Sequence, residues 1–157
     1  MTQKIRALIL LGSISLTVFA EEATDSQQWE GQALKEVVTL SAVPVNIKVL
    51  LGVGNPGLEG VGERGDAFNE IDLIDPRLPM RRFIVAGVGK NISLLALEKG
   101  GYEHFVEVFL FSDVDGTTVM KKNWVLPAFV KHKWVVPYVP TTLKEVIERI
   151  PDAARED

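Results

Sequence analysis

The stretch from about residue 81 to residue 136 constrains the fold most, because apolar segments of strand length alternate there with short turn signals. Gly89-Lys90-Asn91, Gly100-Gly101 and Asp115-Gly116 separate these segments. Glycine-containing pairs of this kind supply the positive φ angles that tight hairpin turns require. The segment 106–111 is apolar at nearly every position, which is typical of a central strand. The pattern therefore predicts an antiparallel meander of four strands, with a fifth at 130–136.

The residues before the meander predict helical structure. Apolar side chains at helical spacing favour a helix over 27–38, although Gly31 weakens it. Residues 43–51 alternate like a strand, but they also fit a helix that starts near Pro44 and ends at Gly52. We favour the helix for this segment and keep the strand as the alternative.

The residues after the meander predict a second helix, over about 142–150. Thr142 and Glu145 have the spacing of a capping box, and Pro151 ends the helical pattern. Helices segregated from hairpins indicate the α+β class, with the helical segments covering one face of the sheet. The expected core consists of Phe83, Val85, Leu95, Leu97, Phe105, Phe109, Phe111 and Trp124, joined by Leu34 and Ile147.

The first twenty residues have the layout of a secretory signal peptide. Two basic residues precede an uncharged run from Ala7 to Phe19, and Val18-Phe19-Ala20 fits a cleavage site with small residues. The run is too short for a transmembrane anchor, which needs about 20 apolar residues. We therefore expect cleavage after Ala20, a periplasmic or secreted location, and one α+β domain over 21–157. The absence of cysteine from an exported chain favours a bacterial envelope.

Two surfaces are candidates for function. The first is a basic aromatic segment, because residues 116–144 contain no acid and their lysines alternate with aromatic residues. Basic groups beside aromatic rings can bind another envelope protein or an anionic envelope polymer. The alternative is a strand pair with solvent-facing lysines that protect a sheet edge. The candidate residues are Lys121, Lys122, Trp124, Lys131, His132, Lys133, Trp134 and Tyr138.

The second candidate is an acidic, glycine-rich loop. Six acids lie within 59–75, and carboxylates can perform acid–base chemistry where burial shifts their pKa values. His104 could assist them, whereas a solvated acidic edge is the alternative interpretation. The acids are Glu59, Glu63, Asp66, Glu70, Asp72 and Asp75.

No complete catalytic pattern accompanies these surfaces. The chain has no cysteine, no G-x-S-x-G motif and only two histidines. Its net charge of -4 argues against nucleic-acid binding. We therefore expect a small, exported, non-enzymatic binding protein of the bacterial envelope, such as an inhibitor or immunity protein, with no metal or cofactor. The alternatives are a small envelope hydrolase that uses the loop carboxylates and an accessory subunit of an envelope assembly.

Overall fold

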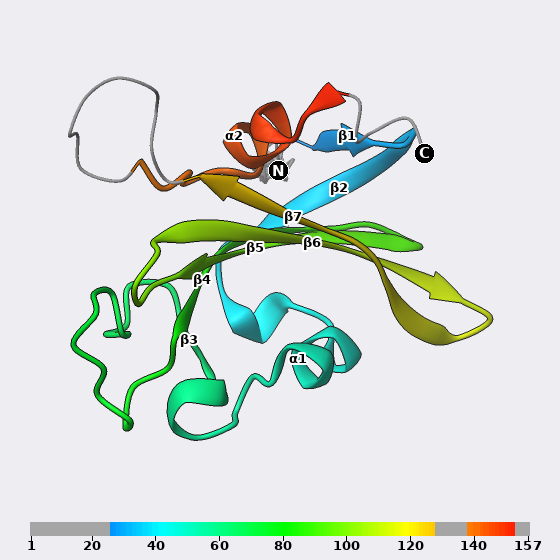
Figure 1. The fold of residues 1–157 in the computed structure, drawn as a ribbon. Coiled ribbons are helices and arrows are strands. Elements are labelled where there is room, and N and C mark those ends of the chain that lie inside the picture. The colour runs from blue at the N-terminus through cyan, green and yellow to red at the C-terminus, as the bar shows by residue number, and fades with distance from the viewer. Residues whose placement is uncertain (1–25, 128–137, 153–157) are drawn as a thin grey trace, which may run out of the picture.

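The computed structural model describes residues 26–127 and 138–152, which form a sheet with two short α-helices (Figure 1). The strand order is β1-β2-β4-β5-β6-β7, and neighbouring strands on this path are antiparallel. The short strand β3 pairs with β4 in parallel. The elements are β1 (Gln27–Trp29), β2 (Gln32–Val37), the 3-10 helix η1 (Leu40–Ala42), α1 (Val45–Leu51), the 3-10 helix η2 (Gly57–Glu59), β3 (Val61–Gly62), β4 (Arg81–Val88), β5 (Ile92–Lys99), β6 (Phe105–Val114), β7 (Thr117–Pro127) and α2 (Leu143–Arg149).

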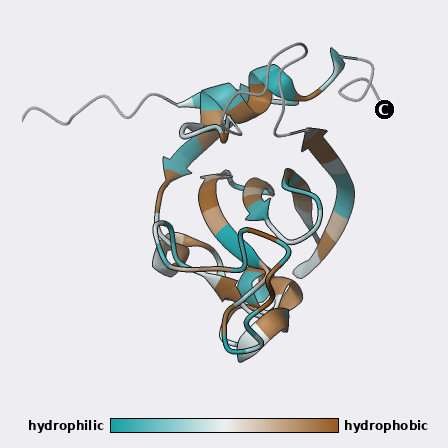
Figure 2. Cartoon of the chain, turned by 60° about the vertical axis from the view of Figure 1, so that its left-hand side comes forward, coloured by the Kyte–Doolittle hydropathy of each residue, from teal (hydrophilic) through white to brown (hydrophobic). Residues whose placement is uncertain are grey.

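The α+β class and the antiparallel meander are confirmed, but the sheet is larger than the sequence predicts. It has seven strands and curls into an incomplete barrel (Figure 2). Strands β4 to β7 form the meander, and the turn at Asp115-Gly116 has the two left-handed residues, φ 50° and 78°, of a tight hairpin. The expected fifth strand at 130–136 lies outside the described residues.

The helix predicted over 27–38 is wrong, because this segment forms the β1–β2 hairpin. Glu30 and Gly31 have φ angles of 48° and 74°, and they form the two-residue turn. The hairpin buries Trp29 and Leu34 and leaves Ala33 exposed. The apolar spacing that resembles a helix therefore arises from two short strands joined by a turn that Gly31 permits.

The helix favoured for 43–51 is confirmed as α1. Pro44 directly precedes it, and Gly52 ends it in the left-handed conformation with φ 77°. The N–H of Gly52 donates to the carbonyl groups of Lys48 and Val49, which satisfies the end of the helix.

The C-terminal helix is also confirmed, as α2. The hydroxyl of Thr142 accepts a hydrogen bond from the backbone N–H of Glu145 at 3.3 Å. The carboxylate of Glu145 accepts from the N–H of Thr141 at 2.7 Å, and a backbone hydrogen bond from Thr142 also contributes to the lowered pKa of Glu145, as the predicted capping box requires. Glu36 on β2 accepts from the N–H of Leu143 at 2.8 Å, which ties the start of α2 to the sheet.

The two helices cover opposite faces of the sheet, not the same face as the sequence predicts (Figure 1). Strand β4 contains a bulge between Phe83 and Val85. The bulge interrupts the regular alternation of side chains between the two faces of the sheet. The core therefore divides in two. The α2 cluster contains Trp29, Leu34, Ile84, Val85, Ile92, Leu94, Ala96, Val106, Val108, Leu110, Leu126, Leu143, Val146 and Ile150. The α1 cluster contains Leu40, Val43, Ile47, Leu51, Val61, Phe83, Ala86, Leu95, Leu97, Phe109 and Phe111.

The tight hairpin expected at Gly100-Gly101 is instead a five-residue loop, 100–104, between β5 and β6. Gly101 does have a positive φ, of 100°. Gly100 has a different role, because a Cβ there would overlap the backbone carbonyl oxygen of Asn69. The N–H of Gly100 also donates to the carbonyl of Met80 at 3.1 Å. Gly100 thus allows the long loop before β4 to pack directly against the β5–β6 loop, and this contact positions the candidate site.

Candidate functional site

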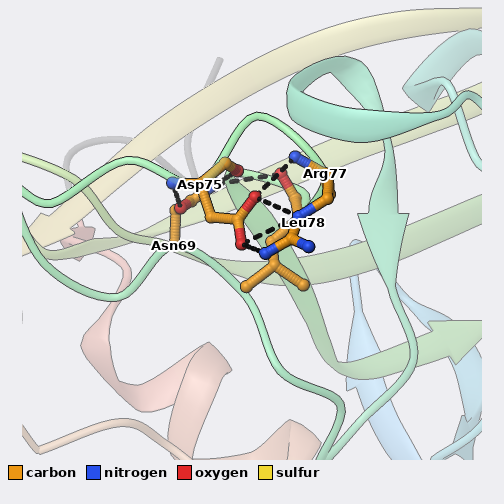
Figure 3. A network of polar contacts seen from close by, with 4 residues as sticks. All are labelled: Asn69, Asp75, Arg77 and Leu78. Carbon is orange, nitrogen blue, oxygen red and sulfur yellow. Dashed lines mark hydrogen bonds and ion pairs between the residues drawn. The ribbon is translucent and has the colours of Figure 1, made fainter.

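The long loop 66–80 is held in shape by a buried amide (Figure 3). Asn69 is 3% exposed, and its Nδ2 donates to the carbonyl groups of Asp75 and Leu78 at 3.0 and 2.9 Å. Its Oδ1 accepts from the N–H of Asp75 at 2.7 Å. One side chain therefore satisfies several backbone groups across the loop, which fixes the loop without regular secondary structure.

A surface ion pair braces the same loop. The guanidinium of Arg77 contacts both carboxylate oxygens of Asp75, with Nε–Oδ1 at 2.9 Å and Nη2–Oδ2 at 2.6 Å (Figure 3). Hydrogen bonds from the Arg77 side chain lower the pKa of Asp75 to about 2, with the Arg77 backbone N–H and its charge adding to the effect. Asp75 is thus engaged in a turn and is not a group poised for proton transfer near neutral pH.

A buried carboxylate joins the loop to the sheet. Glu98 on β5 has a side chain that is 4% exposed, and its Oε2 lies 2.6 Å from Nη2 of Arg82, its cross-strand neighbour on β4. Its Oε1 lies 2.7 Å from Nε2 of His104 in the β5–β6 loop. The guanidinium of Arg82 also lies 4.2 Å from the ring centroid of Phe68 and donates to the carbonyl of Asp66 at 3.1 Å. Glu98 therefore connects the sheet, the loop 66–80 and the β5–β6 loop.

These two loops enclose a pocket of about 720 Å³ at the end of the sheet where β6 begins. Its volume lies in the range of sites that hold small molecules or the side chains of a partner. Apolar and aromatic side chains form much of its wall, and three carboxylates and His104 complete it. The lining residues are Glu70, Ile71, Asp72, Gly101, Tyr102, Glu103, His104, Phe105 and Val125.

The pocket carries negative charge that the described part of the chain does not neutralise. The ion pairs between described side chains involve Asp75, Glu98 and Glu107 as acids. None of them involves the three carboxylates of the pocket, Glu70, Asp72 and Glu103. Among residues 26–127 and 138–152, no lysine or arginine lines the cavity, and His104 already contacts Glu98.

A smaller cavity of about 290 Å³ lies on the other side of the buried carboxylate. Arg82 and Glu98 line it, together with Arg64 and the segment 139–141 before α2. Its one carboxylate, Glu98, already pairs with Arg82 within the wall. We therefore take the larger pocket as the candidate site.

The acidic loop predicted from the sequence divides into structural and pocket carboxylates. Glu63 accepts from the N–H of Leu40 at 3.0 Å and so caps η1, and Asp66 accepts from the N–H of Glu63 at 3.0 Å. Asp75 belongs to the Arg77 turn described above. Of the six acids, only Glu70 and Asp72 line the pocket, and His104 lines it with them.

The basic aromatic segment is only partly described. Trp124 is half-buried on β7 and packs edge-on against Trp29, with ring centroids 5.7 Å apart, next to the α2 cluster. Lys121 is exposed and Lys122 is half-buried on the same strand. Tyr138 is exposed, and the Arg149 guanidinium lies 5.6 Å from its ring centroid. The other members, Lys131, His132, Lys133 and Trp134, lie outside the described residues.

Two features of the site are missing from the sequence interpretation. Glu98 is an acidic residue in the mostly apolar run 92–99. A charged residue in such a run indicates a buried side chain that needs a partner, and this was the available signal. The pocket itself combines residues 70–72 with 101–105, which are distant in sequence, and no local pattern predicts this pairing. The resulting wall includes Tyr102 and Glu103, which the sequence did not single out.

The chain matches no protein-family model, no curated protein and no solved structure. Within residues 26–127 and 138–152, no helix is long and apolar enough to cross a membrane. In the same ranges, no three His, Asp or Glu side chains form a group that could hold a metal ion.

Proposed function

We propose that the chain is an exported, non-enzymatic binding protein of the bacterial envelope, and that it holds a protein partner at the pocket between residues 70–72 and 101–105. The cavity of about 720 Å³, with exposed apolar side chains in its wall, carries this proposal. Inhibition of an envelope-acting enzyme, or immunity to one, is the kind of role that such a surface serves. Export rests on the signal-peptide pattern of residues 1–20.

The exposed apolar groups support binding of a protein. Tyr102 is 91% exposed, and Ile71 and Val125 are 64% and 58% exposed in the same pocket wall. Leu73, which follows Asp72 in the loop, is 83% exposed. Exposed apolar side chains beside charged groups are characteristic of interaction sites. Tyrosine is also enriched among the residues that contribute most to binding energy.

A second candidate, a small envelope hydrolase, is favoured by one observation. The pocket brings Glu70 and Asp72 together with His104, which is the combination that acid–base catalysis would need. We rank it second because the ring nitrogen Nε2 of His104 already contacts Glu98. Three other carboxylates of the acidic loop, Glu63, Asp66 and Asp75, bond to the backbone or to Arg77.

Site-specific photo-crosslinking in intact bacteria tests the proposal. A photoreactive phenylalanine analogue replaces Tyr102 in the pocket or, in a second strain, Tyr138 in the basic aromatic segment. Both tyrosines are exposed, so the two positions offer matched probes. A discrete crosslinked protein at Tyr102, lost when Ile71 is changed to Asp, supports a partner at the pocket. A crosslink only at Tyr138 would assign binding to the basic aromatic segment instead.

The hydrolase alternative has its own measurement. The purified chain is incubated with cell-wall fragments, and released soluble products are measured for it and for Glu70→Gln with Asp72→Asn. We expect no release above the buffer control. Release that the double variant abolishes would refute the non-enzymatic role and favour the hydrolase.

A further inference from the structure

We infer that the pocket at residues 70–72 and 101–105 binds a basic side chain, arginine or lysine, of the partner protein. This inference rests on the proposed function and specifies its partner by chemistry. It follows from the combination of an apolar wall, an aromatic ring and carboxylates that no described basic side chain neutralises.

The shape of an arginine or lysine side chain matches the two kinds of surface in the pocket. Both side chains have an apolar stem and a charged head, and both place the stem along apolar groups while the head stays with polar ones. Ile71, Phe105 and Val125 provide the apolar wall, and they lie in the same cavity as the acids. A purely apolar ligand would desolvate the carboxylates without compensation, whereas a basic side chain supplies their counterion.

Charge complementarity indicates that the ligand is positively charged. Glu70, Asp72 and Glu103 line the cavity, and no lysine or arginine in the described part of the chain does. A concave site lined by charges of one sign concentrates ions of the opposite sign and speeds their association. An anionic envelope polymer would meet repulsion at this pocket, so the basic aromatic segment and the pocket are expected to differ in their partners.

The aromatic side chains add a second attraction for a cation. Tyr102 is 91% exposed, so its ring is accessible to a partner. Intramolecular examples show that rings in this region accept cations: Arg82 lies 4.2 Å from the Phe68 ring centroid, and Lys99 Nζ lies 5.2 Å from that of Phe105. Such a contact contributes roughly 0.5–1 kcal/mol at an exposed site.

The structure also explains why the carboxylates stay available. His104 would be the natural internal cation for them, but its Nε2 lies 2.7 Å from Glu98. Glu98 also pairs with Arg82 at 2.6 Å, and Arg82 lines the smaller cavity rather than the pocket. The buried carboxylate thereby engages Arg82 and His104, and neither of them forms an ion pair with the pocket acids, which remain available to an external partner.

Selection from a random-peptide display library on the full chain tests this inference. The same library is selected on Glu70→Gln with Asp72→Asn, which removes two pocket charges at exposed positions. A control variant, Glu30→Gln with Glu148→Gln, removes two exposed charges in the β1–β2 turn and on α2. We expect arginine or lysine to be enriched at one peptide position on the wild type and the control, and not on the pocket variant.

A binding measurement then isolates the charge. The best selected peptide is compared with an analogue in which citrulline, a neutral isostere, replaces the enriched arginine, or norleucine the enriched lysine. We expect about a tenfold or greater loss of affinity, corresponding to about 1.4 kcal/mol, and the loss should shrink at high salt. In the pocket variant, which keeps only Glu103 of the three pocket carboxylates, the difference between the two peptides should fall to less than half of its wild-type value in free energy. Thermal melts establish that each variant is folded.

Several outcomes overturn the inference. Absence of basic enrichment, enrichment that persists on the pocket variant, or enrichment of acidic residues would each do so. If free arginine binds with the same affinity as the selected peptide, the ligand of the pocket is a small cation and not a protein partner. A crosslink at Tyr102 in bacteria together with no basic enrichment would leave the proposed function standing and refute only this chemistry of the partner.

Discussion

Replacement of Glu98 by glutamine should strongly destabilise the fold, because it leaves the half-buried Arg82 and His104 without the carboxylate that contacts them both. The side chain of Glu98 is 4% exposed, and its two oxygens lie 2.6 Å from Arg82 and 2.7 Å from His104. Glutamine has almost the same volume, so the change removes charge without creating a cavity. Its amide nitrogen also turns one acceptor into a donor that faces a basic group.

The magnitude follows from the burial of each partner. Removal of one member of a buried ion pair costs about 3–5 kcal/mol. The Arg82 side chain is 25% exposed, so solvent can compensate part of its charge. We therefore expect Glu98→Gln to lower the free energy of unfolding by about 2–4 kcal/mol.

Urea unfolding at neutral pH, followed by tryptophan fluorescence, measures this effect. With typical urea slopes of about 1–3 kcal/mol per molar, the midpoint should fall by on the order of 1 M or more. Glu107→Gln is a matched control, because Glu107 makes one longer contact, 3.4 Å, to a Lys99 that is 37% exposed. Its cost should stay below about 1 kcal/mol.

A double-mutant cycle separates the interaction energy of the Arg82–Glu98 pair from the other effects of each substitution on stability. Arg82→Gln and Glu98→Gln are measured singly and together, and neighbours in one ionic network usually couple by about 0.5–3 kcal/mol. A loss below about 0.5 kcal/mol for Glu98→Gln, which is within the range of ordinary surface changes, would refute the reasoning. A coupling indistinguishable from zero would also contradict the assigned network.

Three further predictions concern the loops and the last helix. Gly100→Ala should lower the free energy of unfolding by more than about 1 kcal/mol in urea melts, because its Cβ would overlap the backbone carbonyl of Asn69. Thr142→Ala should cost about 1 kcal/mol in the same assay, because it removes the cap of α2; an unchanged midpoint would contradict that role. The Asp75 carboxyl should titrate near 2 by NMR and move toward 3.8 in Arg77→Gln. Because this pKa is lowered in the folded state, the turn is stabilised above pH 3.8 and loses that contribution as the pH falls through about 2.

The sequence predicts helices and strands correctly where a residue suited to a turn or a helix end adjoins an apolar pattern. Asp115 and Gly116 provide two left-handed residues between apolar strands, and the hairpin forms there. Thr142 and Gly52 likewise identify the start of α2 and the end of α1, because the ends of a helix need specific hydrogen-bonding partners.

The failures have a common cause in contacts between distant residues. The spacing of apolar residues from Trp29 to Val37 fits a helix as well as two short strands, and pairing of β2 with β4 decides for strands. Similarly, Gly100 resembles a hairpin glycine, but the loop 66–80 packs on it and needs its small size. The division of helices between two faces depends on the β4 bulge, which only the paired sheet defines.

Contacts between distant residues also explain why the sequence predicted only part of the candidate site. Glu70 and Asp72 stand out in an acidic loop, but their relation to Tyr102 exists only after two loops pack together. Glu98 joins these loops without lining the larger pocket. It contacts His104 in the β5–β6 loop, and it contacts Arg82, which donates to the carbonyl of Asp66 in the loop 66–80. The carboxylate therefore connects both walls of the pocket through Arg82 and His104, and these two basic groups pair with it rather than with the pocket acids. The stability of the fold and the arrangement of the two pocket walls thus depend on the same buried residue.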